Sequence, residues 1–362
     1  MHLFFTETKK LDMKQTLFAL SILLSASYAN AQNGGKTVFN FLNHSTSARM
    51  TGLGGNMIAT NDKELALAWS HPASLSKEMN GQVVVSYDAM LQGVGSAYLG
   101  YAKYIGKANM TFHGGLQYFT YGTFDAADEF GNKQGTFSAQ DMALAIGASR
   151  KLSEKWSLGL NTKFIYSNLE SYTATGFSTD VSGMYFDPEK RFTFSMVAKN
   201  MGSQLSTYTN APRGALPFEL QMGVSKRLKH LPFRVSLIAK DLQKWDVTYN
   251  DPNAKVETSI IGETKKATPA IVKQLDNTAR HLLLNGEFYL GKKENISVRF
   301  AYNYLSKKEL SVPPLRSATG FSLGFGVKTS RFRIDFGHNF LHTVGGFNHF
   351  TFATNLNSFR KK

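Results

Sequence analysis

The sequence contains no cysteine, which excludes a disulfide scaffold, thiolate catalysis and cysteine-based zinc sites. Charge is also scarce: Asp, Glu, Lys and Arg make up 19% of the 362 residues, below the roughly 25% that is typical of soluble domains. After the amino-terminal stretch, no segment reaches about 18 consecutive apolar residues, so a helical membrane protein is not expected. Aromatic residues (13%) and glycine (31 residues) are plentiful, which favours strands joined by tight turns.

The amino terminus has the pattern of an export signal. Met13-Lys14-Gln15 forms a short basic start, residues 17–24 are an apolar centre, and Ala29-Asn30-Ala31 is an A-x-A cleavage site. Residues 1–31 are therefore predicted to be a signal peptide that is cleaved between Ala31 and Gln32. Residues 1–12 are interpreted as an extension from a translation start that was assigned too early, and the functional start is expected near Met13. The apolar run is too short to cross a bilayer as a helix.

From about residue 82 the chain alternates large apolar with small or polar residues in stretches of about ten, which is the pattern of β-strands. Strands are predicted at 82–91, 94–105, 108–121, 138–152, 156–170, 177–187, 191–202, 217–228, 233–242, 280–290, 296–304, 321–328, 331–340 and 349–356. This is about fourteen strands, an even number, each long enough to cross a bilayer when tilted. The fold class predicted for residues 81–362 is an all-β, antiparallel transmembrane β-barrel of the Gram-negative outer membrane.

The charges of these strands keep to one face. Charge is costly on the lipid side of a barrel and acceptable inside it. One face carries Phe, Tyr, Leu, Val and Ile, and the other carries Gly, Ser, Asn and the ionised side chains. The side chains predicted to face the lumen are Lys163, Lys199, Arg234, Lys240, Arg299, Arg333 and Asp335. A soluble β-sandwich has shorter strands, and a β-helix would show a short fixed repeat, so both are disfavoured.

The links between strands differ in length. Short turns such as 104–107 and 291–295 are predicted to be periplasmic, and the long links 122–137, 203–216, 243–279 and 306–319 external. The polar stretch 243–279 is expected to be a mobile loop. Residues 32–80 do not alternate; they are predicted to form a glycine turn at 52–55 and a short helix that starts near Asn61 or Asp62 and ends at His71-Pro72. Because this segment precedes the first strand in the sequence, we expect it to fold into the lumen as a plug. A flexible periplasmic arm is the alternative.

The excess of Lys and Arg (41) over Asp and Glu (26) gives a formal charge of +15, which suits a polyanion. For an exported protein we expect phosphorylated lipopolysaccharide or an acidic protein partner rather than nucleic acid. Charges that only solubilise the barrel rims remain an equal alternative.

Three short motifs could suggest chemistry, and each has a simpler explanation. Residues 320–324 match G-x-S-x-G, but they lie inside a predicted strand instead of the strand–turn–helix that a hydrolase requires. Residues 74–77 match S-x-x-K without its partner motifs. His338, His342 and His349 are interpreted as girdle and rim residues. No catalytic, cofactor-binding or metal-binding residue is therefore predicted, and the chain is not expected to be an enzyme.

Residues 34–75 carry a family resemblance. Residues 34–42, Ser47-Ala48-Arg49, the glycines Gly52, Gly54 and Gly55, and residues 65–73 ending in His71-Pro72-Ala73 resemble the start of the PorQ family of the Bacteroidetes type IX secretion system. The last segment is similar to an Asn-Pro-Ala-type motif, with His71 in place of Asn. The motif is also similar to that of PorV and of FadL-type fatty-acid transporters, taken to be fourteen-stranded.

The resemblance implies a role in the attachment complex at the cell surface. There, a PorQ-like barrel would anchor the surface protein PorZ, beside the sortase PorU and the barrel PorV, while cargo is processed and joined to lipopolysaccharide. No catalytic residue is implied. The alternative function is FadL-like transport of hydrophobic small molecules, for which Met57, Ile58, Leu65, Leu67 and Trp69 are candidate pocket residues; fold analogy alone is a weak argument for it.

Overall fold

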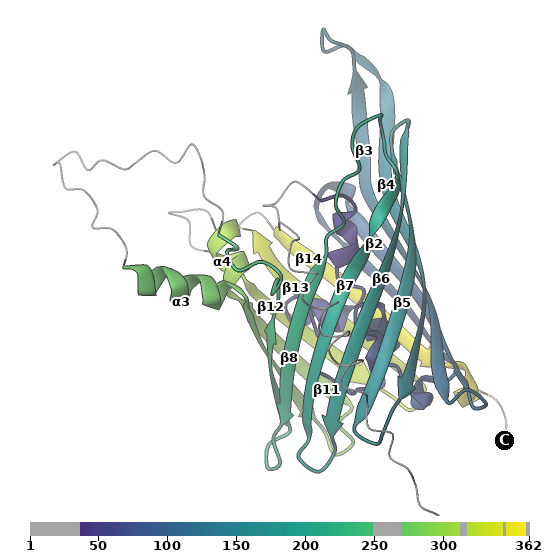
Figure 1. Cartoon of the computed structure of the whole chain (residues 1–362), viewed down its shortest axis with the longest axis vertical. Helices are drawn as coiled ribbons and strands as arrows, with labels where there is room; N and C mark the ends of the chain where they lie inside the picture. Colours follow the sequence, from purple (N-terminus) through teal and green to yellow (C-terminus); the bar gives the residue numbers. More distant parts are fainter. Residues whose placement is uncertain (1–36, 249–268, 312–316, 343–344, 360–362) are drawn as a thin grey trace, which may run out of the picture. The chain divides into compact units, whose positions relative to one another are not determined.

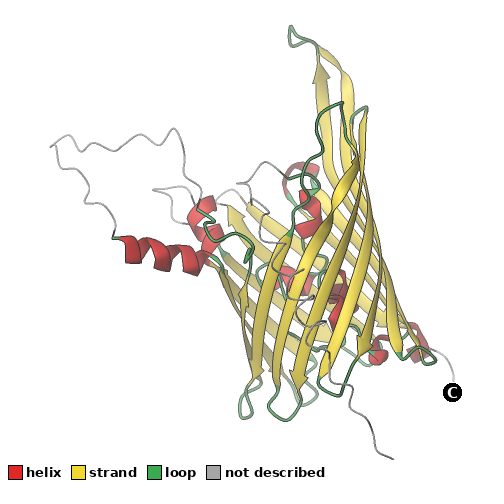
Figure 2. Cartoon of the chain, viewed as in Figure 1, coloured by secondary structure: helices red, strands yellow, loops and turns green. Residues whose placement is uncertain are grey.

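The chain folds into a closed barrel of fourteen antiparallel strands, which confirms the predicted fold class (Figures 1 and 2). The computed structural model describes residues 37–248, 269–311, 317–342 and 345–359. Each strand pairs with its sequence neighbours, and β1 pairs with β14 to close the barrel. The strands are β1 Gln82–Ala89, β2 Gly95–Ile105, β3 Met110–Ala127, β4 Lys133–Lys151, β5 Trp156–Leu169, β6 Tyr172–Asp187, β7 Phe192–Ser206, β8 Glu219–Arg227, β9 Phe233–Ala239, β10 Leu282–Leu290, β11 Ile296–Asn303, β12 Phe321–Lys328, β13 Phe332–His342 and β14 Gly345–Asn355.

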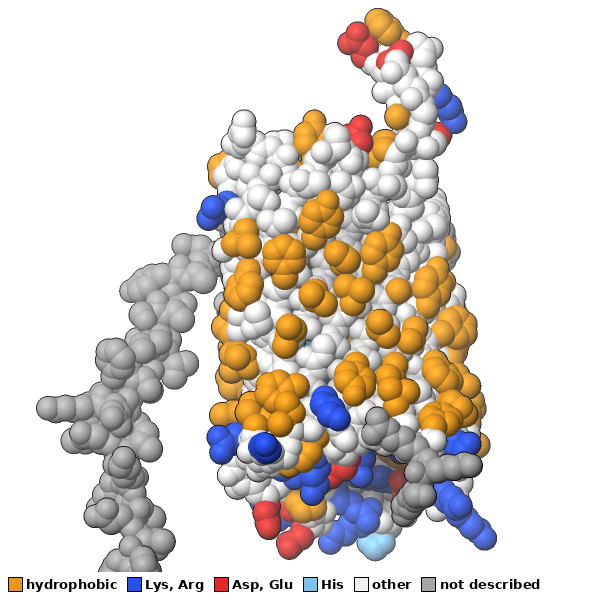
Figure 3. All heavy atoms as spheres, turned by 90° about the vertical axis from the view of Figure 1, so that its right-hand side faces the viewer, with side chains coloured by type: hydrophobic (Ala, Val, Ile, Leu, Met, Phe, Trp, Pro, Cys, Tyr) orange, Lys and Arg blue, Asp and Glu red, His pale blue; other side chains and the backbone are white. Residues whose placement is uncertain are grey.

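The outward face of the barrel is an apolar belt. Residues that lie opposite each other in register share a face of the sheet, and the outward pairs are apolar. Phe325 pairs with Phe336, and Phe336 pairs with Phe350. Leu144 and Ile146 on β4 are 51% and 65% exposed. Figure 3 shows this belt around the middle of the barrel, with Lys and Arg gathered below it. A belt of exposed apolar side chains is what lipid contact requires.

The hairpin of β3 and β4 is longer than predicted. The sequence pattern placed residues 122–137 in an external link, but the two strands run through most of it and extend beyond the other strands (Figure 1). Thr123 pairs with Ser138, and the rings of Phe124 and Phe137 stack with their centroids 5.3 Å apart. Past the belt both faces of the hairpin meet solvent, so the contrast between apolar and polar faces that marks the other strands is lost.

Residues 37–80, which we call the N-terminal segment, lie inside the barrel. The helix α2 (Ala48–Gly52) contacts strands β11 to β14, whereas the 3₁₀ helix η4 (Pro72–Ser74) contacts β4, β5 and β6 on another part of the wall. The segment also contains the 3₁₀ helices η2 (Asn40–Asn43), η3 (Leu65–Trp69) and η5 (Lys77–Met79). Contact with separate parts of a closed wall requires an interior position.

The helix predicted to begin at Asn61 or Asp62 starts later than expected. It is the short 3₁₀ helix η3, and Glu64 just before it is extended, with φ −122°. The side chains of Asp62 and Glu64 bind arginines and do not cap a helix. The helix α2, capped by the Ser47 side chain through the Met50 N–H, was not predicted.

Two of the long links contain α-helices. Residues 243–279 were expected to be a mobile loop, but Ala270–Arg280 form the helix α3; residues 249–268 of that link lie outside the described residues. The helix α4 (Tyr304–Leu310) and the 3₁₀ helices η6 (Leu91–Gly93) and η7 (Leu356–Phe359) complete the elements. Among the residues that the structure describes, no helix has both the length and the apolar character needed to cross a membrane. The predicted signal peptide and its cleavage site at Ala31 and Gln32 fall outside the described residues.

Candidate functional site

The contact between α2 and the barrel wall is made by glycines. A Cβ atom at Gly52 would lie 2.8 Å from the Cα of Gly324 on β12, and one at Gly337 on β13 would overlap the Ala48 carbonyl. The backbone N–H of Ala48 donates to Thr351 Oγ1 at 2.8 Å. Small residues are therefore required where the helix backbone meets the strands. Gly324 belongs to the G-x-S-x-G match, and this contact gives that glycine a packing role.

A cluster of ion pairs joins the N-terminal segment to β9, β10, β11 and β13. Glu287 accepts hydrogen bonds from Arg49 Nε at 2.8 Å and from Arg299 Nε at 2.9 Å. Arg234 reaches Asp62 at 2.6 Å, and Arg333 reaches Glu64 at 2.8 Å. The cluster contains four arginines and four carboxylates: Arg49, Arg234, Arg299, Arg333, Asp62, Glu64, Glu287 and Asp335.

The cluster is electrically balanced and mostly withdrawn from solvent. The side chains of Arg49, Glu287 and Asp335 are 3% exposed or less. Burial alone would raise the pKa of the Asp62 carboxyl, but the Arg234 and Arg49 guanidinium groups outweigh it and hold that pKa well below its usual value. Because removal of one partner leaves a buried charge uncompensated, the cluster holds the segment in one position.

The His71-Pro72-Ala73 motif docks on β5 and β6 without using charge. The Ala73 N–H donates to Ser182 Oγ at 2.8 Å, and Ser157 Oγ donates to the Ala73 carbonyl at 3.0 Å. A Cβ atom at Gly159 would overlap the backbone of Pro72 and Ala73. His71 is fully buried in the same place, and burial lowers its pKa to about 3, so its ring is neutral.

The backbone of η3 is also held by β5. Asn161 Nδ2 donates to the carbonyls of Ala68 and Trp69, at 2.7 and 2.9 Å, while its Oδ1 bonds to His113 Nε2. Lys163, on the same strand, lies 5.0 Å above the Trp69 ring and pairs with Asp180 at 2.6 Å. The hydrogen bonds from β5 to η3 are therefore made to backbone carbonyls.

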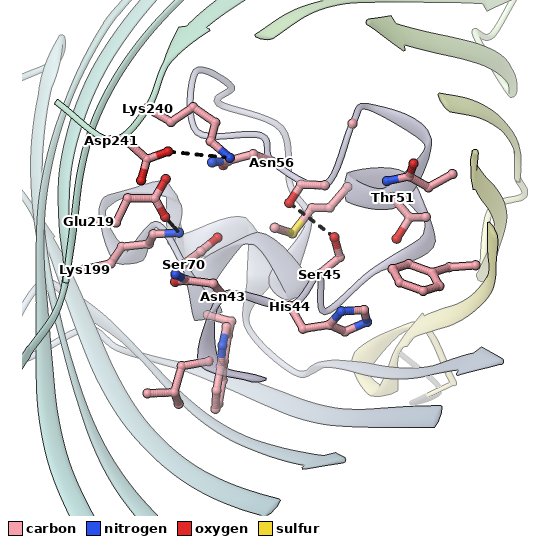
Figure 4. Close-up of a pocket in the computed structure, with 17 residues that line it drawn as sticks. Asn43, His44, Ser45, Thr51, Asn56, Ser70, Lys199, Glu219, Lys240 and Asp241 are labelled. Carbon is pink, nitrogen blue, oxygen red and sulfur yellow. Dashed lines mark hydrogen bonds and ion pairs between the residues drawn. The ribbon is translucent and has the colours of Figure 1, made fainter. Parts of the chain in front are cut away.

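A cavity of about 240 Å³ lies between the N-terminal segment and the wall (Figure 4). On the wall side, Lys199 pairs with Glu219 at 2.9 Å, and Lys240 lies 4.0 Å from Asp241. On the segment side it is lined by residues 42–45, Gly54, Gly55 and Asn56. Charged and amide side chains face the space, so it suits water or a polar group better than a hydrocarbon.

The structure places the sequence-predicted site residues as follows. Lys163, Lys199, Arg234, Arg299 and Asp335 are buried, and Lys240 and Arg333 are partly exposed; each belongs to an ion pair. Gly54 and Gly55 both have positive φ, at 86° and 87°, in the turn after α2. Apart from Asp335, the acids that balance these cations were not singled out from the sequence, and Arg49 was named only as part of the family resemblance. Arg49 and Glu287 are 238 residues apart, and no local pattern marks such a pair.

The remaining sequence motifs have structural positions. Ser74 donates to the His71 carbonyl at 2.7 Å, and Ser322 is buried on β12. His338 bonds to Asn348 at 2.8 Å. His349 was interpreted as a rim residue, and this is wrong: it is buried and contacts Thr51 Oγ1 at 2.9 Å, because its strand turns it inward. Within the described ranges, no three or more His, Asp or Glu side chains are placed to hold a metal ion.

Several large apolar side chains are exposed at the end of the barrel that carries the long links. Phe130 is at the tip of the β3–β4 hairpin and is 82% exposed. Trp245, Ile271 and Leu275 are 71%, 65% and 65% exposed, in and before α3. All four lie in links and helices rather than in the strand belt.

Comparison with solved structures finds barrels of the same architecture. The TodX monoaromatic hydrocarbon channel deltaS2 mutant is 13% identical, with a TM-score of 0.50, over 86% of this chain and 97% of that one. The Pseudomonas putida toluene transporter TodX (13% identity, TM-score 0.49, 86% and 96% coverage) and a Pseudomonas aeruginosa FadL homologue (11%, 0.46, 86% and 98%) are similar at a lower level. At these identities the likeness shows the fold alone. Comparison with curated proteins gives no match.

A family profile gives the more specific result. The profile described as "Type IX secretion system protein PorV" matches residues 27–209, about half of the 362 residues. The match covers the N-terminal segment with its glycines and its His71-Pro72-Ala73 motif, and continues through the first strands of an outer-membrane barrel. The chain therefore belongs to the PorV family of type IX secretion system proteins.

Proposed function

We propose that this protein is a non-enzymatic, PorQ-like component of the type IX attachment complex that anchors a PorZ-like surface protein to the outer membrane. In this proposal the apolar belt holds the barrel in lipid, and the N-terminal segment, locked by its ion pairs, acts as a plug that prevents leakage. Cargo processing and attachment to lipopolysaccharide are left to partners of the PorU and PorV type. Export by a cleaved signal peptide is part of the same proposal.

The observation that carries the proposal is the exposed apolar surface around α3. Ile271 and Leu275 are one helical turn apart and share a face. Exposed apolar patches on an otherwise polar surface mark interaction sites, and an amphipathic helix is a common recognition element. In outer-membrane barrels the end with long links faces the cell exterior, which is where a surface protein would dock.

The helix α3 is fixed to the barrel rim, as an anchor point requires. Its Asp276 accepts a hydrogen bond from the Tyr304 hydroxyl at 2.6 Å and lies 3.6 Å from Lys308. Its Asn277 side chain bonds to the Trp245 carbonyl, and the next residue after the helix, His281, bonds to the Lys240 carbonyl at 2.7 Å. The Trp245 ring stacks on His281 at 6.2 Å. Docking here would cost little additional ordering.

The test is a pull-down from outer membranes in mild detergent, with the double variant I271D/L275D. Loss of both apolar contacts should lower retention of the surface partner at least tenfold, since a few buried apolar anchors dominate binding. The control K273A changes the opposite side of the same helix. Both variants should insert equally. Full retention by I271D/L275D would contradict docking at α3 and move attention to the hairpin tip at Phe130.

Transport of hydrophobic molecules is less well supported by the lumen. Of the candidate pocket residues, only Trp69 lines the cavity, beside Lys199 and Glu219. Met57 and Leu67 pack together with Met50 and Leu53, and Ile58 packs against wall residues such as Val197. Analysis of lipid that co-purifies with the barrel distinguishes the two functions: a stoichiometric apolar ligand in the lumen would favour transport.

A further inference from the structure

The two ends of the barrel differ sharply in charge. The short-turn end comprises six turns with their flanking strand ends, at 103–109, 150–155, 187–191, 226–232, 291–295 and 328–331. These ranges contain fourteen Lys and Arg against four Asp and Glu, a net formal charge of +10. At the loop end, the described links 90–94, 125–133, 170–171, 207–218, 240–248, 269–281, 304–311 and 317–320 contain eight of each sign.

Little of the positive charge at the short-turn end is neutralised by the protein. Among the residues that the structure describes, two of its four acids are paired with bases of the same end, Asp187 with Lys155 at 3.0 Å and Glu294 with Arg227. Eleven of the fourteen cations are exposed. Figure 3 shows Lys and Arg side chains along this edge, directly under the apolar belt. Such a concentration of one sign attracts anions.

Several of these cations point outward, on the lipid side of the strands. Lys103 lies between Tyr101 and Ile105, which are each 43% exposed, and pairs in register with Phe112. Arg150 continues the outward row of Leu144 and Ile146.

The neighbours of these cations confirm the outward direction. Arg150 pairs with Leu158, which is 48% exposed, on one side and with Met110 on the other. Lys226 pairs with Phe192. A cation that adjoins outward apolar side chains at the end of a strand can keep its stem against lipid and extend its charge to the head groups.

We propose that the short-turn end is a binding surface for anionic phospholipid head groups, with the phosphodiester as the recognised group. In outer-membrane barrels the short turns lie on the periplasmic side, so the ligands would belong to the inner leaflet. The charge occurs at all six turns around the barrel, at five of them as a net excess of cations. A ring of cations matches the annulus of lipid around a barrel, whereas a single protein partner would need one charged sector. Each Lys or Arg near an anionic surface contributes about 1 kcal/mol.

The experiment measures lipid binding by native mass spectrometry of the full-length barrel in a neutral detergent, titrated with phosphatidylglycerol or with zwitterionic phosphatidylethanolamine. The variant K103Q/R150Q/K226Q should bind phosphatidylglycerol at least tenfold more weakly than the unmodified barrel, because about fivefold is expected for each cation lost at low salt. Binding of phosphatidylethanolamine should change little, and 0.5 M salt should weaken only the anionic lipid.

Two further variants separate charge from fold. The variant K133Q/R213Q/K273Q removes three cations from the loop end and should bind phosphatidylglycerol like the unmodified barrel. The charge-preserving variant K103R/R150K/K226R should restore binding, which excludes a general folding defect. Equal binding of both lipids, or an equal loss in the loop-end variant, would overturn the proposal. Unchanged lipid binding by K103Q/R150Q/K226Q would also overturn it. If that variant lost a cross-linked acidic periplasmic protein, the partner of this surface would be that protein.

Discussion

The N-terminal segment is held in the barrel in two different ways. Toward β9–β13 it is fixed by a balanced cluster of charges centred on Arg49 and Glu287. Toward β5 and β6 it is fixed by backbone hydrogen bonds of Ala73 and by the space left at Gly159. The charged side depends on which residues are present, because a missing partner leaves a buried charge. The other side depends on shape and on backbone polar groups, and it requires a glycine at position 159.

The largest effect is expected on the charged side. Glu287→Gln would leave Arg49, Arg234 and Arg299 without their shared carboxylate, and loss of one partner of a buried pair costs about 3–5 kcal/mol. We expect the free energy of local opening of residues 37–80, measured by hydrogen exchange, to fall by that amount. Glu294→Gln is the control, since its pair with Arg227 is half-exposed and contributes about 0–1 kcal/mol. Equal effects of the two variants would show that the cluster does not hold the segment.

A smaller effect is expected from filling the space at β5. In Gly159→Ala the added methyl would overlap the Pro72 and Ala73 backbone, and overpacking costs about 1–3 kcal/mol. Exchange should accelerate at residues 71–75 first. Gly114→Ala, where a Cβ atom meets no other atom within 4 Å, should leave exchange unchanged. A silent Gly159→Ala variant would mean that the motif does not rest on this strand.

A single hydrogen bond on the same side should matter less. Ser182→Ala removes the acceptor of the Ala73 N–H, and a typical hydrogen bond contributes about 1 kcal/mol to stability. The exchange of the Ala73 amide is the direct measurement. Ser195→Ala, on the neighbouring strand β7, is a matched control, because Ser195 is buried without a hydrogen-bond partner among the described residues. Protection of Ala73 that is equal in both variants would argue against this contact.

The smallest effect is expected from mild acid. The pKa of the Asp62 carboxyl is lowered in the folded protein, so its contribution is complete above the unfolded value of about 3.9 and is lost only as pH falls through the lower folded value. Protection of residues 60–64 should therefore stay constant from pH 7 to pH 5 and fall below about pH 4. The β5 side carries no carboxylate in its contacts with Ala73 and should not respond. Loss of protection near pH 6 would be inconsistent with an ionised, arginine-bound Asp62.

The strands could be predicted from the sequence because each one carries its own alternation. Phe321, Leu323 and Phe325 mark an outward face without reference to any other segment, and β12 is found there. The ends of strands were less predictable where solvent covers both faces, as in the β3–β4 hairpin. The helix α3 was missed because the surrounding link 243–279 is polar overall and its apolar residues, Ile271, Val272 and Leu275, are few.

Only some of the charged residues inside the barrel could be recognised from the sequence. Lys163, Arg234 and Arg299 stand out as charges on an inward row. Two of their acidic partners do not, because Asp62 lies in a segment without periodicity and Glu287 is the one charged residue of its strand. The distances in sequence between partners, 172 residues for Arg234 and Asp62, leave no spacing to recognise.

The sequence by itself determined the barrel, its approximate strand number and its apolar belt, since period-two alternation and turn residues act over a few neighbours. Only the tertiary structure decided which charges meet, where the N-terminal segment rests and how the cations divide between the two ends. Those outcomes depend on closure of the sheet, which brings residues hundreds of positions apart to the same wall and sends alternate turns to opposite ends.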